Sequence, residues 1–431
     1  MLGNCAGSAE IEEVMVPRAL RARRSRGRIL RGLGLLVLLA LGSFLAWNLA
    51  RVASALGVSS LLRSSGDPRF AWPLRLRDRV NVLLIGTDIT LTTRRQVVPD
   101  LARADTLVLM SFDPHTRTAQ FLSIPRDTRV RLPDHGTSKI NASYALGGIP
   151  LTVRAVEDLV GVRVHYYLKM GAESFAQLVD AVGGVWVDVE QDMHYQDWWG
   201  GFSVNLKKGR QLLTGDQAMG YARFRMDALG DIGRVQRQQK VIRALFARMR
   251  EPQTVLRFPQ LLHWFRTRVH TNLDIQKVLT LGWFLHGIGT DHIRTATLPG
   301  RFAPLFWEPD EPRVRALVLE MFYGLDPQAV AQTRVEVLNA SEVPGMAREV
   351  AARLERMGFP VVRVDVAPRP RNQTAIVSHR GDARLAQAVR EMLGTGALAT
   401  RPTQVMHADL TVLVGRDYAH RRLLARRSIT P

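Results

Sequence analysis

The chain has 431 residues, 46% of them hydrophobic, and carries a formal net charge of +20, mainly from arginine. This length suits two or three domains, and the charge points to an anionic partner: nucleic acid, a membrane surface or a phosphorylated substrate. Cys5 is the only cysteine. A disulfide framework, a thiol nucleophile beyond that position and a cysteine-ligated metal are therefore excluded.

The first predicted element is an uncharged, leucine-rich segment of 19 residues, Gly32 to Ala50. A helix of this length spans a bilayer. Seven arginines precede it, and the positive-inside rule then predicts a cytoplasmic N-terminus with the rest of the chain outside. The alternative is a signal peptide cleaved at Ala53-Ser54-Ala55. We expect a single-pass protein of the cytoplasmic membrane, with a basic cytoplasmic tail (1–31), a transmembrane helix (32–50) and a stalk (51–78). Export argues against nucleic acid as the partner.

Strands alternate with helices beyond the stalk. The patterns predict strands at 80–85, 106–112, 118–124, 166–170 and 185–189, and helices at 151–159, 172–182, 215–224 and 231–249. This alternation predicts an α/β fold, an α-β-α sandwich, for the domain at 79–325. Residues 251–325 are less regular and rich in large apolar side chains, most of which we expect in the core.

A second, smaller α/β domain is predicted at 333–418. Its expected strands are 334–339, 359–366 and 410–414, and its expected helices are 344–357 and 385–393. A basic tail follows at 419–431, and we expect it to be disordered from Arg421 onward.

Two aspartates flank the first two predicted strands of the larger domain. Asp88 closes the first strand and Asp105 immediately precedes the second. If these strands are neighbours, both carboxylates lie near one edge of the sheet. Carboxylates with water and phosphate oxygens suit Mg²⁺, and Mn²⁺ is an alternative. Either aspartate alone is better explained as a loop cap.

Several cations follow predicted elements. Arg126 comes directly after a buried strand and a rigid proline, Lys139 adds a second cation, and Arg223 and Arg225 lie close to the helix at 231–249. Guanidinium groups bind phosphate in a bidentate fork. Each residue alone suits a surface position or a salt bridge. Together with the two aspartates they indicate a diphosphate site.

The helix at 231–249 has two polar residues where apolar ones are expected. On a helical wheel, Arg234 and Gln238 share the apolar stripe that continues from Val241 to Met249. They lie near the helix N-terminus, where free N–H groups and the dipole favour an anion. A buried arginine needs an anionic partner. That partner is a protein carboxylate or a ligand phosphate, and the spacing leaves both open.

A set of motifs in a fixed order carries a family resemblance. The motifs are Asn81–Asp88, Arg103–Thr106, Ser123–Thr128, Lys139–Asn141, Tyr221–Arg225 and Asp231–Gln239. Together they resemble the LytR-CpsA-Psr family, and residues 333–418 resemble the C-terminal domain often attached to its LytR-type members. Ala104 departs from the family pattern, which often has serine there.

The resemblance implies a membrane-anchored, extracytoplasmic phosphotransferase. Such an enzyme moves a glycopolymer phosphate from a polyprenyl-diphosphate carrier to peptidoglycan, with the lipid tail in an apolar pocket. It implies that Asp88 and Asp105 bind Mg²⁺. The implied diphosphate ligands are Arg126, Arg223, Arg225, Arg234 and Gln238. Asp105 or Asp127 would accept the proton of the attacking hydroxyl. The alternative function is a non-catalytic, membrane-linked regulator of cell-envelope genes.

Overall fold

The computed structural model describes residues 67, 69–71, 74–87, 103–197, 202–224, 230–251, 253–254, 257–401 and 407–427. None of the helices in these ranges has the length and apolar character needed to cross a membrane. The predicted transmembrane helix at 32–50 lies outside the described residues, and so do two predicted site residues, Asp88 and Arg225.

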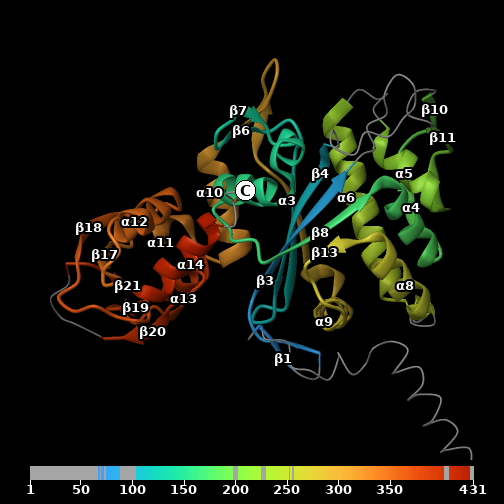
Figure 1. Cartoon of the computed structure of the whole chain (residues 1–431). Coiled ribbons are helices and arrows are strands. Elements are labelled where there is room, and N and C mark those ends of the chain that lie inside the picture. The colour runs from blue at the N-terminus through green and yellow to red at the C-terminus, as the bar shows by residue number, and fades with distance from the viewer. Residues whose placement is uncertain are drawn as a thin grey trace, which may run out of the picture. The chain divides into compact units, whose positions relative to one another are not determined.

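A six-stranded sheet lies at the centre of the larger domain (Figure 1), in the order β13-β8-β3-β4-β5-β14. Its strands are β3 (Val80–Thr87), β4 (Ala104–Asp113), β5 (Thr118–Ile124), β8 (Tyr166–Gly171), β13 (His270–Thr271) and β14 (Ile293–Thr297). β3 is parallel to β8, β5 is parallel to β14, and β4 runs antiparallel between β3 and β5. Strands β3, β5, β8 and β14 therefore end at one edge, where β4 begins. We call this the carboxyl edge and the opposite one the amino edge.

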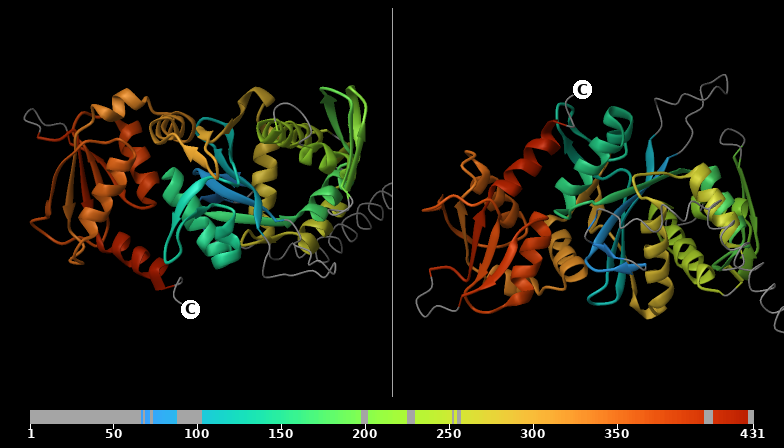
Figure 2. Two further views of the ribbon diagram at one scale, coloured as in Figure 1. Left: turned by 90° about the horizontal axis from the view of Figure 1, so that it is seen from above. Right: turned by 60° about the horizontal axis from the view of Figure 1, so that its bottom comes forward.

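Apolar side chains cover both faces of this sheet because neighbouring residues of a strand point to opposite sides. Leu83 and Ile85 of β3 belong to a cluster that includes α3 (Ala142–Val160) and α10 (Glu311–Val318). Val82 belongs to a second cluster, against α9 (Ile275–Gly287) and α6 (Gly230–Met249). Figure 2 shows helices on both sides of the sheet. The predicted α-β-α sandwich is confirmed.

Helix α3 starts nine residues before its predicted beginning. It is kinked at Gly147 and Gly148, whose backbone angles are not helical, and Pro150 follows. Proline disfavours a helical conformation at the residue before it. The prediction therefore began only at Leu151, beyond this kink.

A smaller layer of helices and hairpins extends from the sandwich and has its own apolar cluster. Its elements are α4 (Ala172–Ala181), β9 (Val185–Val189), β10 (Met193–Asp197), β11 (Phe202–Leu206), β12 (Gly209–Leu213), α5 (Gly215–Arg223) and part of α6. Thr214 and Gln217 form a capping box that fixes the start of α5. The predicted elements α4, β9 and α5 are confirmed, whereas β10, β11 and β12 were not predicted.

Short elements complete the larger domain. They are β1 (Phe70–Ala71), β2 (Arg75–Leu76), β6 (Arg129–Leu132), β7 (Gly136–Lys139), α8 (Phe258–Arg268), η2 (Thr290–His292), β15 (Gly300–Phe302), β16 (Trp307–Pro309), η3 (Leu319–Tyr323) and α11 (Pro327–Ala331).

The C-terminal domain is built on a five-stranded sheet in the order β18-β17-β21-β19-β20. The elements are β17 (Val335–Asn339), α12 (Met346–Arg356), β18 (Val361–Val366), β19 (Ala375–Ser378), α13 (Ala383–Leu393), β20 (Ala397–Thr400), β21 (Leu410–Val414) and α14 (Arg416–Arg427). Val335 and Val412 belong to the same apolar cluster as Leu83 of the larger domain. The two domains therefore share one continuous core.

The basic tail differs from its prediction. The segment expected to be disordered from Arg421 is helical as far as Arg427, in α14. Tyr418 and Ala419 are buried at its first turns, and Arg422 forms an ion pair with Glu349 of α12. Burial of the first turn anchors a helix that the arginine-rich composition concealed.

Candidate active site

Four of the predicted site residues form one ion-paired group at the carboxyl edge of the central sheet. Nη1 of Arg126 lies 2.8 Å from Oδ1 of Asp105, and its Nε lies 3.6 Å from Oδ2 of Asp127. Nζ of Lys139 lies 2.9 Å from Oδ1 of Asp127. We call these four residues the carboxyl-edge cluster. Their side chains are between 17% and 41% exposed, so a ligand can reach them.

Backbone hydrogen bonds hold the cluster in place. The N–H and the hydroxyl of Thr128 both donate to the carbonyl of Pro125, at 3.0 and 2.6 Å. The N–H of Asn141 donates to the carbonyl of Arg126, and the carbonyl of Asn141 accepts from Ala104. The turn that carries Arg126, the segment that carries Lys139 and the start of β4 are thus joined directly.

Asp105 occupies a β-bulge. Gly86 pairs with Thr106 and Thr87 pairs with Ala104, so Asp105 is the extra residue of β4. Bulges redirect a side chain and are frequent beside active sites. A Cβ at Gly86 would lie 2.9 Å from the Cβ of Thr106, which explains why glycine suits this position.

The metal prediction rests partly on a residue that is not described. β3 ends at Thr87, and Asp88 follows it outside the described residues. The described part of the chain contains no group of three His, Cys, Asp or Glu side chains suited to a metal ion. Oδ1 of Asp105 accepts from Arg126, and no described residue donates to its Oδ2. That open oxygen, next to the end of β3, fits an oxygen-preferring cation.

Helix α6 brings further predicted residues to the same edge. Arg234 is buried, as predicted, and Gln238 is half-buried. Nε2 of Gln239 donates to Oγ1 of Thr297 at 2.9 Å. Thr297 ends β14 and is in register with Ser123 of β5, three residues before Arg126. The third turn of α6, which carries Gln239 and the predicted Gln238, therefore lies at the carboxyl edge. Arg223 ends α5.

Arg237 is a buried residue that the sequence analysis missed. Its side chain is 1% exposed, with Nη1 3.3 Å from Oε1 of Glu190 and Nη2 donating to the carbonyl of Phe224. Burial alone would raise the pKa of Glu190, but hydrogen bonds from Tyr221 and Lys240 outweigh it and lower that pKa. α6 thus carries a structural ion pair at Arg237, one turn after Arg234. The helical wheel places Arg237 roughly 60° from Arg234, at the border of the apolar stripe, and this was the available signal.

The apolar residues at 251–325 only partly follow the prediction. Leu262 is buried, but Trp283 of α9 is 65% exposed rather than part of the core. A cavity of about 40 Å³ lies among residues of α6 and α9 and Ile293 of β14. It is too small for an isoprenoid chain, so the lipid pocket stays a prediction.

Comparison with protein families identifies the chain. Residues 63–324 match the LytR_cpsA_psr family, and residues 332–418 match the domain described as the LytR cell envelope-related transcriptional attenuator. The chain belongs to the LytR-CpsA-Psr family. The resemblance inferred from the six motifs is confirmed, together with the attached C-terminal domain.

Relatives within the family have been named for different functions. The chain is 35% identical over 257 residues to the polyisoprenyl-teichoic acid–peptidoglycan teichoic acid transferase TagU of Oceanobacillus iheyensis, covering 57% of this chain and 76% of that protein. It is 30% identical over 233 residues to the regulatory protein MsrR of Staphylococcus aureus, covering 54% and 68%. The crystal structure of B. subtilis TagV is 30% identical, with coverage of 57% and 98% and a TM-score of 0.49.

Proposed function

We propose that this protein is a cell-wall glycopolymer transferase, which moves a glycopolymer phosphate from a polyprenyl diphosphate to peptidoglycan. Family membership and the similarity to the transferase TagU support this proposal. The observation that carries it is the carboxyl-edge cluster, in which Arg126 lies between Asp105 and Asp127 beside Lys139. Phosphoryl transfer depends on positioning and charge neutralisation, and a group of accessible cations and carboxylates provides both.

In this proposal the cations bind the diphosphate. Arg126 and Lys139 neutralise its oxygens, together with Arg223, Arg225 and Arg234 from α5, α6 and the segment between them. Gln238 of α6 donates a hydrogen bond to them. A hydroxyl of the acceptor glycan attacks the phosphorus linked to the glycopolymer. The new P–O bond forms as the bond to the polyprenyl phosphate breaks, and that phosphate leaves with the bond's electrons. The hydroxyl proton passes to a carboxylate, Asp105 or Asp127.

Asp88 and Asp105 are the proposed ligands of Mg²⁺, or of Mn²⁺. A bound cation would neutralise charge on the phosphate oxygens. The open Oδ2 of Asp105 supports this assignment. If it is correct, Asp105→Asn weakens the binding of Mn²⁺ measured by electron paramagnetic resonance by at least tenfold. Unchanged Mn²⁺ binding would remove Asp105 from the metal site.

The decisive experiment measures transfer of a polyprenyl-diphosphate-linked glycan to peptidoglycan by the full chain. We expect Arg126→Ala to lower the rate by about 10² or more, because removal of one group that stabilises developing charge has an effect of this size. Arg131→Ala is the matched control, since Arg131 is an exposed residue of the neighbouring strand β6. Equal rates for the wild type and Arg126→Ala would refute the site.

A regulatory function is the second candidate, because a similar relative is named the regulatory protein MsrR. Topology separates the two proposals. The transferase needs its larger domain outside the cytoplasmic membrane, with the N-terminus inside. A reporter enzyme that is active only outside the cytoplasm, fused after Pro431, should then be active. Activity of a cytoplasmic reporter alone at that position would favour regulation.

A further inference from the structure

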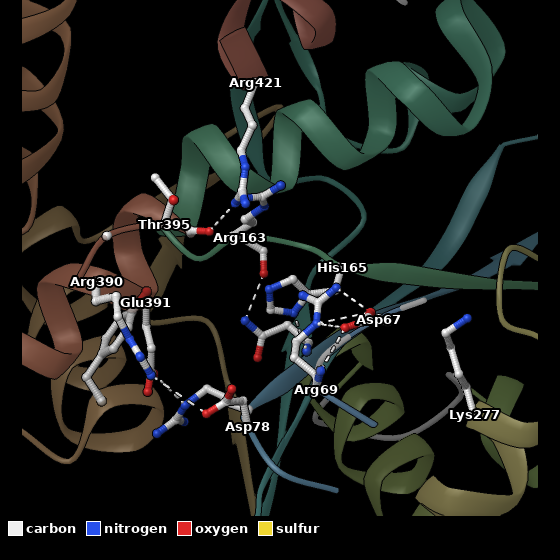
Figure 3. A pocket seen from close by; sticks show the side chains of 15 residues that line it. Asp67, Arg69, Asp78, Arg163, His165, Lys277, Arg390, Glu391, Thr395 and Arg421 are labelled. Atoms are coloured by element: carbon white, nitrogen blue, oxygen red, sulfur yellow. Dashed lines mark hydrogen bonds and ion pairs between the residues drawn. The ribbon is translucent and has the colours of Figure 1, made fainter. Parts of the chain in front are cut away.

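The amino edge of the central sheet meets the C-terminal domain at a cavity of about 690 Å³ (Figure 3). It lies at the opposite end of the strands from the carboxyl-edge cluster. Its lining includes six cationic side chains, Arg69, Arg79, Arg163, Lys277, Arg390 and Arg421. Three carboxylates also line it, those of Asp67, Asp78 and Glu391. We call this cavity the junction cavity, and its lining carries an excess of positive charge.

The lining carboxylates are already paired. Asp67 lies 2.6 Å from Arg69, Glu391 lies 2.9 Å from Arg79, and Asp78 lies 3.7 Å from Arg390. Lys277 is paired with Asp274 outside the lining.

The excess charge therefore belongs to Arg163 and Arg421. Among the described residues, no carboxylate oxygen forms an ion pair with either guanidinium. The two groups come from different domains, Arg163 from the segment before β8 and Arg421 from α14.

Arg163 and Arg421 meet at one glycine. Gly394 ends α13 with a φ of +73°, and a Cβ there would lie 1.9 Å from Nη1 of Arg163. Nη1 of Arg421 donates to the carbonyl of the same glycine. In Figure 3 both side chains extend toward this point, beside Thr395. Two like charges thus approach one another at the C-terminus of α13, and an anion between them would relieve their repulsion.

The electrostatics of the cavity agree with this geometry. Burial lowers the pKa of Arg163, and the neighbouring cations Arg421 and Arg69 lower it further against the opposing carboxylate of Glu157. A guanidinium whose pKa is lowered by neighbouring cations is stabilised by a bound anion.

His165 adds a neutral donor. The N–H of Asn81 donates to Nδ1 of His165 at 2.9 Å, so the neutral ring carries its own proton on Nε2. Burial, followed by Arg69 and Arg163, lowers the pKa of this histidine well below its usual value. The ring is therefore neutral at pH 7 and offers a hydrogen-bond donor to the cavity.

We propose that the junction cavity binds a phosphate ester, about the size of a sugar phosphate, between the guanidinium groups of Arg163 and Arg421. The cavity volume lies within the range of small-molecule sites. Guanidinium groups recognise phosphate through paired N–H donors. Because one arginine comes from each domain, the bound phosphate also joins the two domains. This site lies apart from the proposed transferase site and does not depend on it.

Titration calorimetry of the full chain in detergent tests the proposal. The probes are inorganic phosphate, glucose 1-phosphate and poly(glycerol phosphate), each at constant ionic strength. All titrations use a chain that carries Arg126→Ala, so that phosphate binding at the carboxyl-edge cluster does not contribute to the signal. We expect saturable binding in this background and at least a tenfold loss of affinity in Arg163→Gln and in Arg421→Gln. Arg356→Gln removes an equivalent charge from an exposed position of α12 and should change the affinity by less than twofold.

The results separate the possible sources of the phosphate. Tighter binding of poly(glycerol phosphate) than of the two small probes identifies a wall-polymer phosphodiester, and the reverse identifies a soluble phosphate ester. Absence of saturable binding by all three probes, or equal affinities in all variants, overturns the proposal. Arg421 is exposed, so its replacement leaves the fold intact even if Arg163→Gln unfolds the chain. Transfer activity is not the readout, so failure of the transferase proposal leaves this result unaffected.

Discussion

At the scale of single residues, α6 shows how similar arginines acquire different roles. Arg234 and Arg237 are both buried, although they lie only three residues apart. Arg237 has a protein carboxylate, Glu190, as its partner, and it also packs over the ring of Phe224. Arg237 is therefore held by a structural ion pair, whereas the role of Arg234 in binding a ligand phosphate stays a prediction.

Arg237→Ala should destabilise the fold by about 2–3 kcal/mol. The variant loses the ion pair of a buried guanidinium with the exposed carboxylate of Glu190, a hydrogen bond to the carbonyl of Phe224 and the packing of a long side chain. Chemical denaturation followed by circular dichroism measures the effect. Arg243→Ala, on an exposed position of the same helix, should change stability by less than about 0.5 kcal/mol. A similar loss in both variants would show that Arg237 has no special structural role.

Glu190 makes this contribution dependent on pH. Its pKa is lowered in the folded protein from the ordinary value of 4.5, so its stabilising effect is complete above that value. The effect disappears as the pH falls through the folded-state pKa. Glu190→Gln should therefore be less stable than the wild type at pH 7, and the difference should shrink below about pH 4.5. Denaturation midpoints across this range provide the measurement, and a difference independent of pH would contradict the assignment.

At the scale of elements, close backbone approach determines where α5 lies. Gly215 begins α5, and a Cβ at this position would lie 2.1 Å from the carbonyl oxygen of Ala176 in α4. The N–H of Gly215 also donates to Asp180. Since Arg223 lies at the other end of α5, this contact positions a proposed diphosphate ligand.

Gly215→Ala should displace α5 and lower stability by about 1–3 kcal/mol, as overpacking does elsewhere. Gly282→Ala is a matched control in α9, where a methyl group would have nothing within 4 Å. That change should instead raise stability by up to about 1 kcal/mol, because alanine favours a helix interior. Thermal unfolding of the two variants should thus shift in opposite directions. Shifts of the same sign would contradict the packing argument.

Some elements of the fold follow directly from the local sequence, and others do not, for physical reasons. The central strands β3, β4 and β5 are buried on both faces, and their continuous apolar runs predicted them closely. β10 is short and largely polar, and β11 alternates apolar and polar residues over only five positions, so neither carries a continuous apolar run. Arg126 and Lys139 were predicted from their positions after defined segments. The ion pair of Arg237 depends on Glu190, 47 residues away, and the position of Arg237 at the border of the apolar stripe indicates its burial only weakly.

At the scale of the whole molecule, Arg79 links the larger domain to the C-terminal domain. Its side chain is 9% exposed and lies 2.8 Å from Asp113 and 2.9 Å from Glu391 of α13. It also lies over the ring of Tyr323. The junction cavity was invisible in the sequence because its cations come from segments more than 300 residues apart.

Arg79→Ala should lower stability by about 3 kcal/mol, because it leaves the buried carboxylate of Asp113 without its cation. Differential scanning calorimetry should also show weaker coupling between the domains, as a broader or divided transition. Arg154→Ala removes an exposed ion pair within α3 and should have little effect. If both variants unfold alike, the domains are joined by the shared apolar core alone.

The bulge at Asp105 has a consequence for how β4 tolerates change. Ala104 and Leu107 both belong to the apolar cluster on the α3 face, although an uninterrupted strand would point them to opposite faces. The extra residue shifts the alternation of the strand by one step just before the carboxyl edge. Deletion of one residue here would give a regular ladder, but Ala104 would then point to the opposite face of the sheet. The bulge therefore lets Ala104 stay in the core while the carboxylate of the next residue, Asp105, stays accessible.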